Sequence, residues 1–371
     1  MKIAYLSCSA IPSRAANSIH VVRMCHAFAQ NGNEVTLYVP ALPGREKIDG
    51  SIFEYYGVQR NFKIVTLPWL PIKGRSTIYG ILAAIGAKVG GVDVVYGRDL
   101  KSCYFSVVMR IPVVYETHAP DTGSDNAYAR IYKKMITNQF LRRQVVISEA
   151  LLTIYGDGYP DLGDKQLVAH DGADEIPESV EDILEDKAQI HIGYVGQLYR
   201  GRGIGLIIEL AQRCSWADFH IIGGMDEDIQ YWRNLASSAK NIHFYGFMPY
   251  SDAEKYRCSC DILVAPFEEK VNVFAGGGDT SAWMSPLKMF EYMSAGKAIV
   301  CTNFPVIREV LEHDVTALLC EPNDIDAWIR ALESLRLDEN YRKKLGSTAR
   351  EIFKDKYTWS RRAKNVLEGL T

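Results

Sequence analysis

The residues whose types and spacing best suit chemistry lie in the stretch 285–296. Ser285 is a favourable helix N-cap, Pro286 suits the first helical position, and Gly296 suits the C-terminal stop. The stretch is therefore predicted to be a short helix that begins at Pro286.

Lys288 and Glu291 lie three residues apart in this helix and share one face. The free amides of a helix start, a lysine beside them and the glycine-rich segment 274–283 upstream together predict a phosphate site. Glu291, one turn later, is placed to accept hydrogen bonds from vicinal hydroxyls such as those of a ribose. An ordinary capped helix with a surface ion pair would give the same local pattern, so both interpretations stay open.

The composition is that of a globular chain. It has 371 residues, 47% hydrophobic and 23% charged, enough for two domains of ordinary size. The net charge of −3 gives no electrostatic reason to expect nucleic-acid binding. The eight cysteines lack zinc or thioredoxin spacing and are expected to be reduced thiols of a cytoplasmic protein. Neither a signal-peptide pattern nor an apolar run of membrane-spanning length is expected.

Short apolar strands alternate with helices, which predicts an α/β fold with parallel sheets covered on both faces. The first series of expected strands covers residues 3–6, 34–39, 64–67, 92–96, 113–116 and 145–148, with a helix at 20–31. The second series covers residues 190–195, 219–222, 242–245, 262–265, 298–301 and 317–319, with helices at 206–214, 229–238, 251–258, 286–295 and 324–335.

The acidic segment 171–187 lies between the two series and is expected to be a linker. It separates an N-terminal domain, 1–178, from a C-terminal domain, 179–356. Both are expected to be Rossmann-like, doubly wound domains that face each other across a cleft at the carboxyl ends of their strands. The amphipathic tail 357–371 is expected to be helical and to pack back on the N-terminal domain.

Several motifs, which follow one another along the chain in the order typical of the family, resemble those of the retaining family 4 glycosyltransferases, which have the GT-B fold. Residues 285–297 resemble the donor-binding signature of that family, and Gly193-Tyr194-Val195-Gly196-Gln197-Leu198 with Arg202-Gly203 resembles its strand-loop element. Residues 168–174 resemble its interdomain element, residues 147–150 its "VSE" turn, and residues 114–118 its strand that ends in an active-site histidine. Residues 308–310 and 357–359 also fit, so the resemblance covers almost the whole chain.

The resemblance implies roles for particular residues. The catalytic residues would be His118, Arg202 and Lys288. The donor-binding residues would be Ser285, Leu287, Glu291, Gly196, Gln197, Tyr245, Gly246 and Asp279. The acceptor side, which would dock on the N-terminal domain, would include Asn17, Ser18, Arg98 and Glu116. Purely structural roles stay open for several of these residues, since Asn17 and Ser18 would also serve as helix caps and Arg98 as a surface ion-pair partner.

Transfer from a nucleotide diphosphate sugar must stabilise a departing pyrophosphate. Arg202, Lys288 and the helix start near Leu287 offer the metal-free way to do this. Asp226 and Asp228 form an Asp-x-Asp pattern, but acidic residues at a helix N-terminus explain it better. No metal ion and no cofactor is therefore expected, and the glycines at 201, 203 and 205 lack dinucleotide spacing.

Two positions depart from the family pattern. Most members carry a second glutamate eight positions before the one that matches Glu291, where this chain has Trp283, and an arginine where it has Gln197. Arg200 is expected to compensate for the missing arginine. Asp279 or backbone of the loop 276–283 is expected to compensate for the missing glutamate.

The resemblance thus implies a retaining, metal-independent glycosyltransferase that moves a sugar from a UDP- or GDP-sugar to a hydroxyl of a glycan, lipid-linked or small-molecule acceptor. Its role would lie in cell-surface polysaccharide or other glycoconjugate biosynthesis. The alternatives are a nucleotide-sugar epimerase of the same build and an inactive nucleotide-sugar-binding subunit. The basic, aromatic segment 128–143 would allow contact with the inner face of a membrane, but a solvated helix face explains it better.

Overall fold

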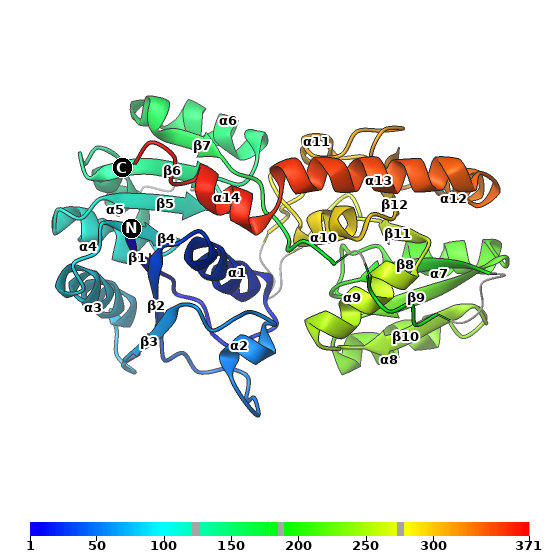
Figure 1. Cartoon of the computed structure of the whole chain (residues 1–371), viewed down its shortest axis with the longest axis horizontal. Helices are drawn as coiled ribbons and strands as arrows, with labels where there is room; N and C mark the ends of the chain where they lie inside the picture. The colour runs from blue at the N-terminus through cyan, green and yellow to red at the C-terminus, as the bar shows by residue number, and fades with distance from the viewer. Residues whose placement is uncertain (121–126, 178, 185–188, 273–277, 371) are drawn as a thin grey trace. The chain divides into compact units, whose positions relative to one another are not determined.

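The chain forms two compact units in the computed structural model, which describes residues 1–120, 127–177, 179–184, 189–272 and 278–370. The first unit comprises Met1–Asp171 and Trp359–Thr371, and the second comprises Gly172–Thr358. Each unit has one parallel sheet with helices on both faces (Figure 1). The expected fold class of two Rossmann-like parallel-sheet domains is confirmed.

The sheet of the first unit has seven strands in the order β3-β2-β1-β4-β5-β6-β7. Its central strands are buried runs of Val, Ile and Tyr, as strands covered on both faces must be. The order reverses between β1 and β4, and the carboxyl ends of such neighbouring strands are where ligands bind in doubly wound sheets. The strands are β1 (Lys2–Leu6), β2 (Glu34–Pro40), β3 (Lys63–Leu67), β4 (Val94–Gly97), β5 (Val113–Thr117), β6 (Leu141–Val146) and β7 (Gln166–Val168).

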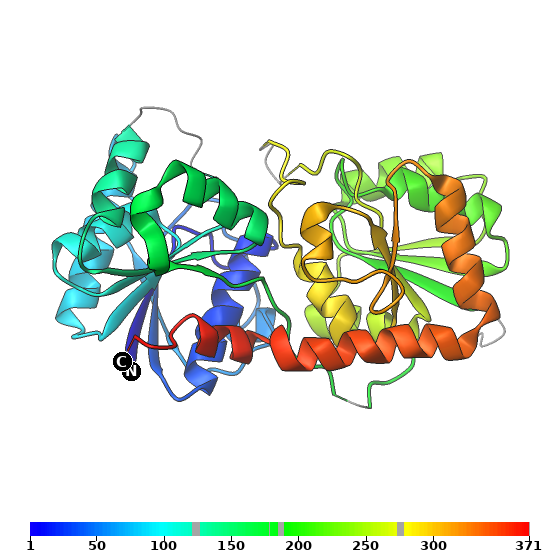
Figure 2. The ribbon, with the colours of Figure 1, turned by 90° about the horizontal axis from the view of Figure 1, so that it is seen from above.

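The C-terminal helix α14 completes the first unit, because it packs against α1 on one face of the sheet while α3, α4 and α5 follow one another on the other face. Figure 2 shows both chain ends on this unit. The helices are α1 (Ala16–Gln30), α2 (Ile52–Tyr55), α3 (Arg75–Val89), α4 (Leu100–Val108), α5 (Ala127–Ile136), α6 (Glu149–Gly158) and α14 (Trp359–Asn365), with a 3₁₀ segment η1 (Pro160–Lys165).

The sheet of the second unit has six strands in the order β10-β9-β8-β11-β12-β13. Helix α7 contacts α8 and α12, and helix α10 contacts α9 and α13. The strands are β8 (Ile190–Val195), β9 (Ala217–Ile222), β10 (Ile242–Gly246), β11 (Ile262–Ala265), β12 (Ala298–Thr302) and β13 (Leu318–Cys320). The helices are α7 (Ile204–Arg213), α8 (Asp226–Leu235), α9 (Tyr250–Ser259), α10 (Leu287–Ala295), α11 (Pro305–Arg308), α12 (Ile325–Leu337) and α13 (Glu339–Lys356).

Some element boundaries differ from the sequence prediction. The predicted N-cap Ser285 is wrong: Pro286 is the N-cap, with φ −71° and ψ 123°, and the helix begins at Leu287. The backbone of Pro286 itself is extended rather than helical, so the helix starts one residue later than predicted. Gly296 ends the helix in the left-handed region at φ 68°, as expected. The helix expected at 20–31 begins earlier, at Ala16, and the tail helix is shorter than predicted.

None of the described helices combines the length and the hydropathy that a membrane span requires.

Candidate active site

The lysine of the expected phosphate site is buried at the start of α10. Lys288 is 9% exposed, and its ammonium nitrogen lies 3.7 Å from the centroid of the Tyr194 ring. Among the described residues, none accepts a hydrogen bond from its Nζ. Burial, and then the charge of Arg202, lower the pKa of Lys288 well below its ordinary value. A bound anion would supply both the missing hydrogen bond and the missing countercharge.

Arg202 is held near Lys288 by the loop between β8 and α7. The guanidinium of Arg202 and the ammonium of Lys288 lie 5.8 and 5.5 Å from the centroid of the Phe267 ring. Arg202 donates to the Tyr199 hydroxyl, and its Nε has no hydrogen-bond partner in the described part of the chain. The next residue, Gly203, has φ 73°, and an added Cβ would lie 1.6 Å from a backbone oxygen, so only glycine fits. The loop therefore fixes Arg202 close to the second cation.

Gly196 and Gln197 line the approach to Lys288. A Cβ at Gly196 would lie 2.9 Å from Lys288 Nζ, so a side chain there would crowd the ammonium. The backbone oxygen of Gln197 accepts from the Tyr194 hydroxyl at 2.6 Å, and its side-chain Oε1 has no partner among the described residues. The position where the family has arginine thus holds a neutral amide in a fixed loop.

Glu291 contacts a cation that the sequence analysis did not consider. Arg257 of α9 is 1% exposed, and its NH1 lies 3.3 Å from Glu291 Oε2. The guanidinium also lies over the Tyr250 ring, 4.7 Å from its centroid. Burial alone would lower the pKa of Arg257, but the carboxylate of Glu291 and the neighbouring Tyr250 and Glu254 more than offset this and raise it. The carboxylate of Glu291 is therefore fixed from one side.

The other expected donor-binding residues have identifiable structural contacts. Asp279 accepts from the backbone N–H groups of Val271 and Ser281 at 2.9 Å, so it orders its own loop. The Tyr245 hydroxyl lies 2.8 Å from Nδ1 of His220. Residues 274–277 of the glycine-rich segment lie outside the described residues. The donor-binding roles of Asp279, Tyr245, Ser285, Leu287 and Gly246 stay predictions.

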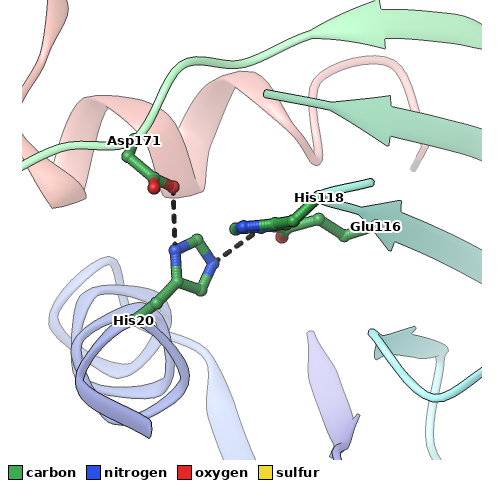
Figure 3. Close-up of side chains that lie close together, drawn as sticks. All are labelled: His20, Glu116, His118 and Asp171. Carbon is green, nitrogen blue, oxygen red and sulfur yellow. Dashed lines mark hydrogen bonds and ion pairs between the residues drawn. The ribbon is translucent and has the colours of Figure 1, made fainter. Parts of the chain in front are cut away.

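In the first unit, four titratable side chains converge at the carboxyl ends of the strands (Figure 3). Glu116 and His118 come from the end of β5, His20 from α1 and Asp171 from the segment after β7. His20 Nε2 lies 2.9 Å from Glu116 Oε1, and His20 Nδ1 lies 2.9 Å from Asp171 Oδ1. His118 Nε2 contacts the same Glu116 oxygen. These contacts make one buried network.

Arg362 of α14 supplies the main countercharge of this network. Its NH2 lies 3.1 Å from Glu116 Oε1 and its NH1 lies 3.3 Å from Oε2, with both side chains almost fully buried. Burial alone would raise the pKa of Glu116, but Arg362 and then His20 reverse this and hold it well below its ordinary value. Glu116 is therefore ionised and can only accept hydrogen bonds, so the Nε2 of His118 is the donor.

His118 is consequently neutral at neutral pH. Burial, and then the charge of Arg98, lower its pKa to about 4, although Glu116 acts in the opposite direction. Because Nε2 carries the proton, Nδ1 is left with its lone pair. A neutral imidazole of fixed tautomer can accept a hydrogen bond from a substrate hydroxyl.

The same four side chains are of types that bind metal ions, and their ligand atoms lie within 4.8 Å of one another. However, Arg362 already contacts both oxygens of Glu116, and the two nitrogens of His20 face two carboxylates. The two nitrogens of His20 nevertheless have no hydrogen-bond partner among the described residues. The guanidinium of Arg362 therefore already occupies the Glu116 carboxylate that a metal ion would need.

The expected acceptor-side residues differ in their accessibility. Asn17 is exposed, whereas Ser18 is buried and its hydroxyl bonds Ser13 and Ala15 backbone oxygens at 2.7 and 2.8 Å. Arg98 is half-buried, and its NH1 has no partner among the described residues. Glu116 is fully buried, which leaves it no exposed atom for an acceptor. The structure gives Glu116 the supporting contact to His118 instead.

Sequence reasoning missed Arg257 and Arg362 as site residues. Neither lies in a recognisable motif, and each pairs with a carboxylate far away along the chain. The acidic residues Asp226, Glu227 and Asp228 lie in the first turn of α8, at the helix N-terminus as predicted, and the absence of a metal ion there stays a prediction.

The chain is similar in sequence to known glycosyltransferases. Residues 175–352 match the family model described as glycosyl transferases group 1, and residues 18–163 match the model described as glycosyltransferase family 4. Over 200 residues the chain is 26% identical to the uncharacterized glycosyltransferase MJ1069 of Methanocaldococcus jannaschii, covering 50% of this chain and 48% of that protein. Over 151 residues it is 27% identical to the amylovoran biosynthesis glycosyltransferase AmsK of Erwinia amylovora, covering 39% of this chain and 35% of that protein. The chain thus matches about half and about a third of these relatives.

Solved structures match over the whole length. Anabaena HepE in complex with UDP has a TM-score of 0.72 at 16% identity, covering 100% of this chain and 99% of HepE. Sucrose-phosphate synthase from Thermosynechococcus elongatus has a TM-score of 0.72 at 16% identity, covering 98% of this chain and 97% of that structure. The expected GT-B fold is confirmed by these structures, and two glycosyltransferase family models each match one part of the chain.

Proposed function

We propose that the chain is a retaining, metal-independent glycosyltransferase that uses a nucleotide diphosphate sugar as donor. The observation that carries this proposal is the buried ammonium of Lys288, which has a second cation beside it and no hydrogen-bond acceptor among the described residues. Two cations at a helix start are suited to a departing pyrophosphate, whose charge grows during transfer. The matches to glycosyltransferase models support the same reaction class.

The donor is proposed to be a UDP- or GDP-sugar. HepE has been solved in complex with UDP and with UDP-glucose, which supports a nucleotide sugar for a chain of the same fold. Glu291 is proposed to bind the ribose hydroxyls, and Arg202 and Lys288 the two phosphates. The acceptor is proposed to be a hydroxyl of a glycan, a lipid-linked sugar or a small molecule, bound by the first unit near His118.

Contact with an anionic membrane surface stays a separate proposal. In α5 the cations Arg130, Lys133 and Lys134 are exposed, while Tyr132 and Met135 are buried in the unit. Such contact would therefore be electrostatic rather than an insertion of apolar side chains.

The test is incubation of the protein with radiolabelled UDP- and GDP-sugars, with and without chelator. Transfer, or slow donor hydrolysis, that survives chelator supports the proposal, and NMR of the product should show the donor's anomeric configuration retained. Strict dependence on added manganese or magnesium would overturn the metal-free mechanism. An isomerised donor would instead show an epimerase, and binding without turnover would show an inactive binding subunit, as Trp283 and Gln197 led us to consider.

A further inference from the structure

We propose that Arg257 is a positioning residue that holds Glu291 for ribose and keeps it away from Lys288. The proposal rests on the donor-binding function above and deepens it. It concerns a residue in α9 that lies in none of the motifs by which the site was found.

The contact itself is specific and buried. Arg257 is among the largest fully buried side chains of the protein, and its ion pair with Glu291 measures 3.3 Å between NH1 and Oε2. The Glu291 side chain is 16% exposed, so it lies at the boundary between the interior and a ligand. Arg257 binds Oε2, which leaves the second oxygen, Oε1, to accept from a hydroxyl.

The pairing is costly for the fold alone. Arg257 Nε and NH2 are buried and have no hydrogen-bond partner among the described residues. A buried donor without a hydrogen-bond partner destabilises the folded state. A guanidinium that is hydrogen-bonded to Glu291 through only one of its nitrogens therefore contributes little to stability. The arrangement is better explained by a requirement on the position of Glu291.

The second consequence concerns Lys288. Lys288 and Glu291 lie three residues apart on one helix, where opposite charges usually pair. The Glu291 charge does raise the pKa of Lys288, yet Nζ has no hydrogen-bond partner within the described chain. Arg257, on the neighbouring helix α9, competes with Lys288 for the carboxylate of Glu291. Its removal should let Glu291 turn to Lys288, which would cost both the ribose contact and part of the phosphate contact.

The preference for a ribonucleotide over its 2′-deoxy form tests the proposal, because a purely structural role of Arg257 would leave this preference unchanged. Affinities of UDP and 2′-deoxy-UDP, and of GDP and 2′-deoxy-GDP, are to be measured by calorimetry. The wild-type protein is expected to prefer the ribonucleotide by about 10–100-fold, the scale of a hydrogen bond to a charged group. R257M should reduce that preference to within about threefold, and R257K should retain most of it, because lysine keeps the positive charge.

Two further variants complete the design. E291Q should lose discrimination as R257M does, and the double variant R257M/E291Q should be no worse than E291Q alone, because Arg257 acts through Glu291. The matched control is R342M, since Arg342 is another arginine of the second unit with a carboxylate partner, Asp261, at 3.7 Å. R342M should leave the ribose preference unchanged.

The outcomes separate the two proposals. A wild-type protein that binds neither UDP nor GDP contradicts the proposed function. A wild-type protein that prefers ribose while folded R257M and R257K keep that full preference overturns the role of Arg257 only. Additive losses in the double variant would also overturn it, since they would mean that Arg257 acts independently of Glu291.

Discussion

At the residue scale, the buried charge of Lys288 should couple ligand binding to proton uptake. Burial and the charge of Arg202 lower the pKa of Lys288, whereas a bound diphosphate would raise it again. Binding of UDP or GDP should therefore take up a proton, and affinity should fall as pH rises. Calorimetry in buffers of different ionisation enthalpy should give different binding heats for the wild type and equal heats for K288M.

The control for this measurement is K255M, which removes an exposed lysine of α9 paired with Glu181. It should keep the buffer dependence of the wild type. K288A should also lower turnover by about a hundredfold, the scale of losing one transition-state charge stabiliser. Binding heats that do not depend on the buffer in the wild type would show that Lys288 is not the group that meets the diphosphate.

His118 should act on the reacting sugar or the acceptor and not on the nucleotide. It belongs to the first unit, whereas the proposed nucleotide-binding residues belong to the second. H118A should therefore cut kcat while leaving the affinity for UDP or GDP nearly intact. Steady-state kinetics and calorimetry on the same preparation check this. A large loss of nucleotide affinity with normal turnover would show that His118 contacts the nucleotide and not the reacting sugar or the acceptor. No change in either quantity would show that His118 is a structural histidine.

At the element scale, α14 connects the end of the chain to the candidate active site. Arg362 donates to both oxygens of Glu116, and Glu116 accepts a hydrogen bond from His118 Nε2. R362M should leave a buried carboxylate unpaired and lower the stability of the first unit by about 3–5 kcal/mol. In the protein that remains folded, kcat should fall as His118 loses its fixed tautomer, while nucleotide affinity should be retained.

Denaturant unfolding, kcat and nucleotide affinity measured for R362M, R362K and K364M together test this link. Lys364 lies exposed on the same short helix, so K364M should behave as the wild type. R362K should recover part of the turnover. A drop in stability without any effect on kcat would show that α14 only completes the fold.

The elements themselves were largely predictable, because short apolar runs and helix signals are local. The strands β8 and β11 were predicted to the residue, as was the end of α10 at Gly296. The strand expected at 145–148 was displaced: β6 begins at Leu141, where two arginines interrupt the apolar run. The short edge strand β7 was missed, since three half-buried residues carry little hydrophobic signal.

The candidate site was predictable only where chemistry follows the local sequence. Lys288 and Glu291 could be found because they share one helix with a recognisable start and stop. The partner of Glu291 lies 34 residues away and that of Glu116 lies 246 residues away, with no motif at either arginine. Such pairs are set by tertiary packing, so no reading of spacing could have shown that Arg257 and Arg362 support the site.

At the scale of the whole molecule, the chain leaves the first unit, builds the second and returns to finish the first. Each unit contains a histidine whose neutral form is favoured by folding: His118 in the first and His220 in the second. The whole chain should therefore be labile in acid, with contributions from both units.

His220 allows this to be tested away from the catalytic residues. Its Nε2 lies 3.0 Å from His191 Nδ1 and its Nδ1 lies 2.8 Å from the Tyr245 hydroxyl. Burial, and then the neighbouring His191 and His243, lower its pKa to about 3. Because the folded state disfavours its protonation, this contribution to stability is complete above the unfolded value near 6.5. It is lost as pH falls from there toward 3, by about 1.4 kcal/mol per pH unit.

Urea unfolding of the wild type at pH 7.5, 6 and 5 should show this loss, and H220Q should show a shallower pH dependence because glutamine does not titrate. H313Q is the matched control, since His313 is exposed and is not among the groups that shift the pKa of His220. It should keep most of the wild-type slope. Equal slopes in the wild type and H220Q would mean that His220 takes up its proton without cost to the fold, and acid lability would then have to arise in the network around His118.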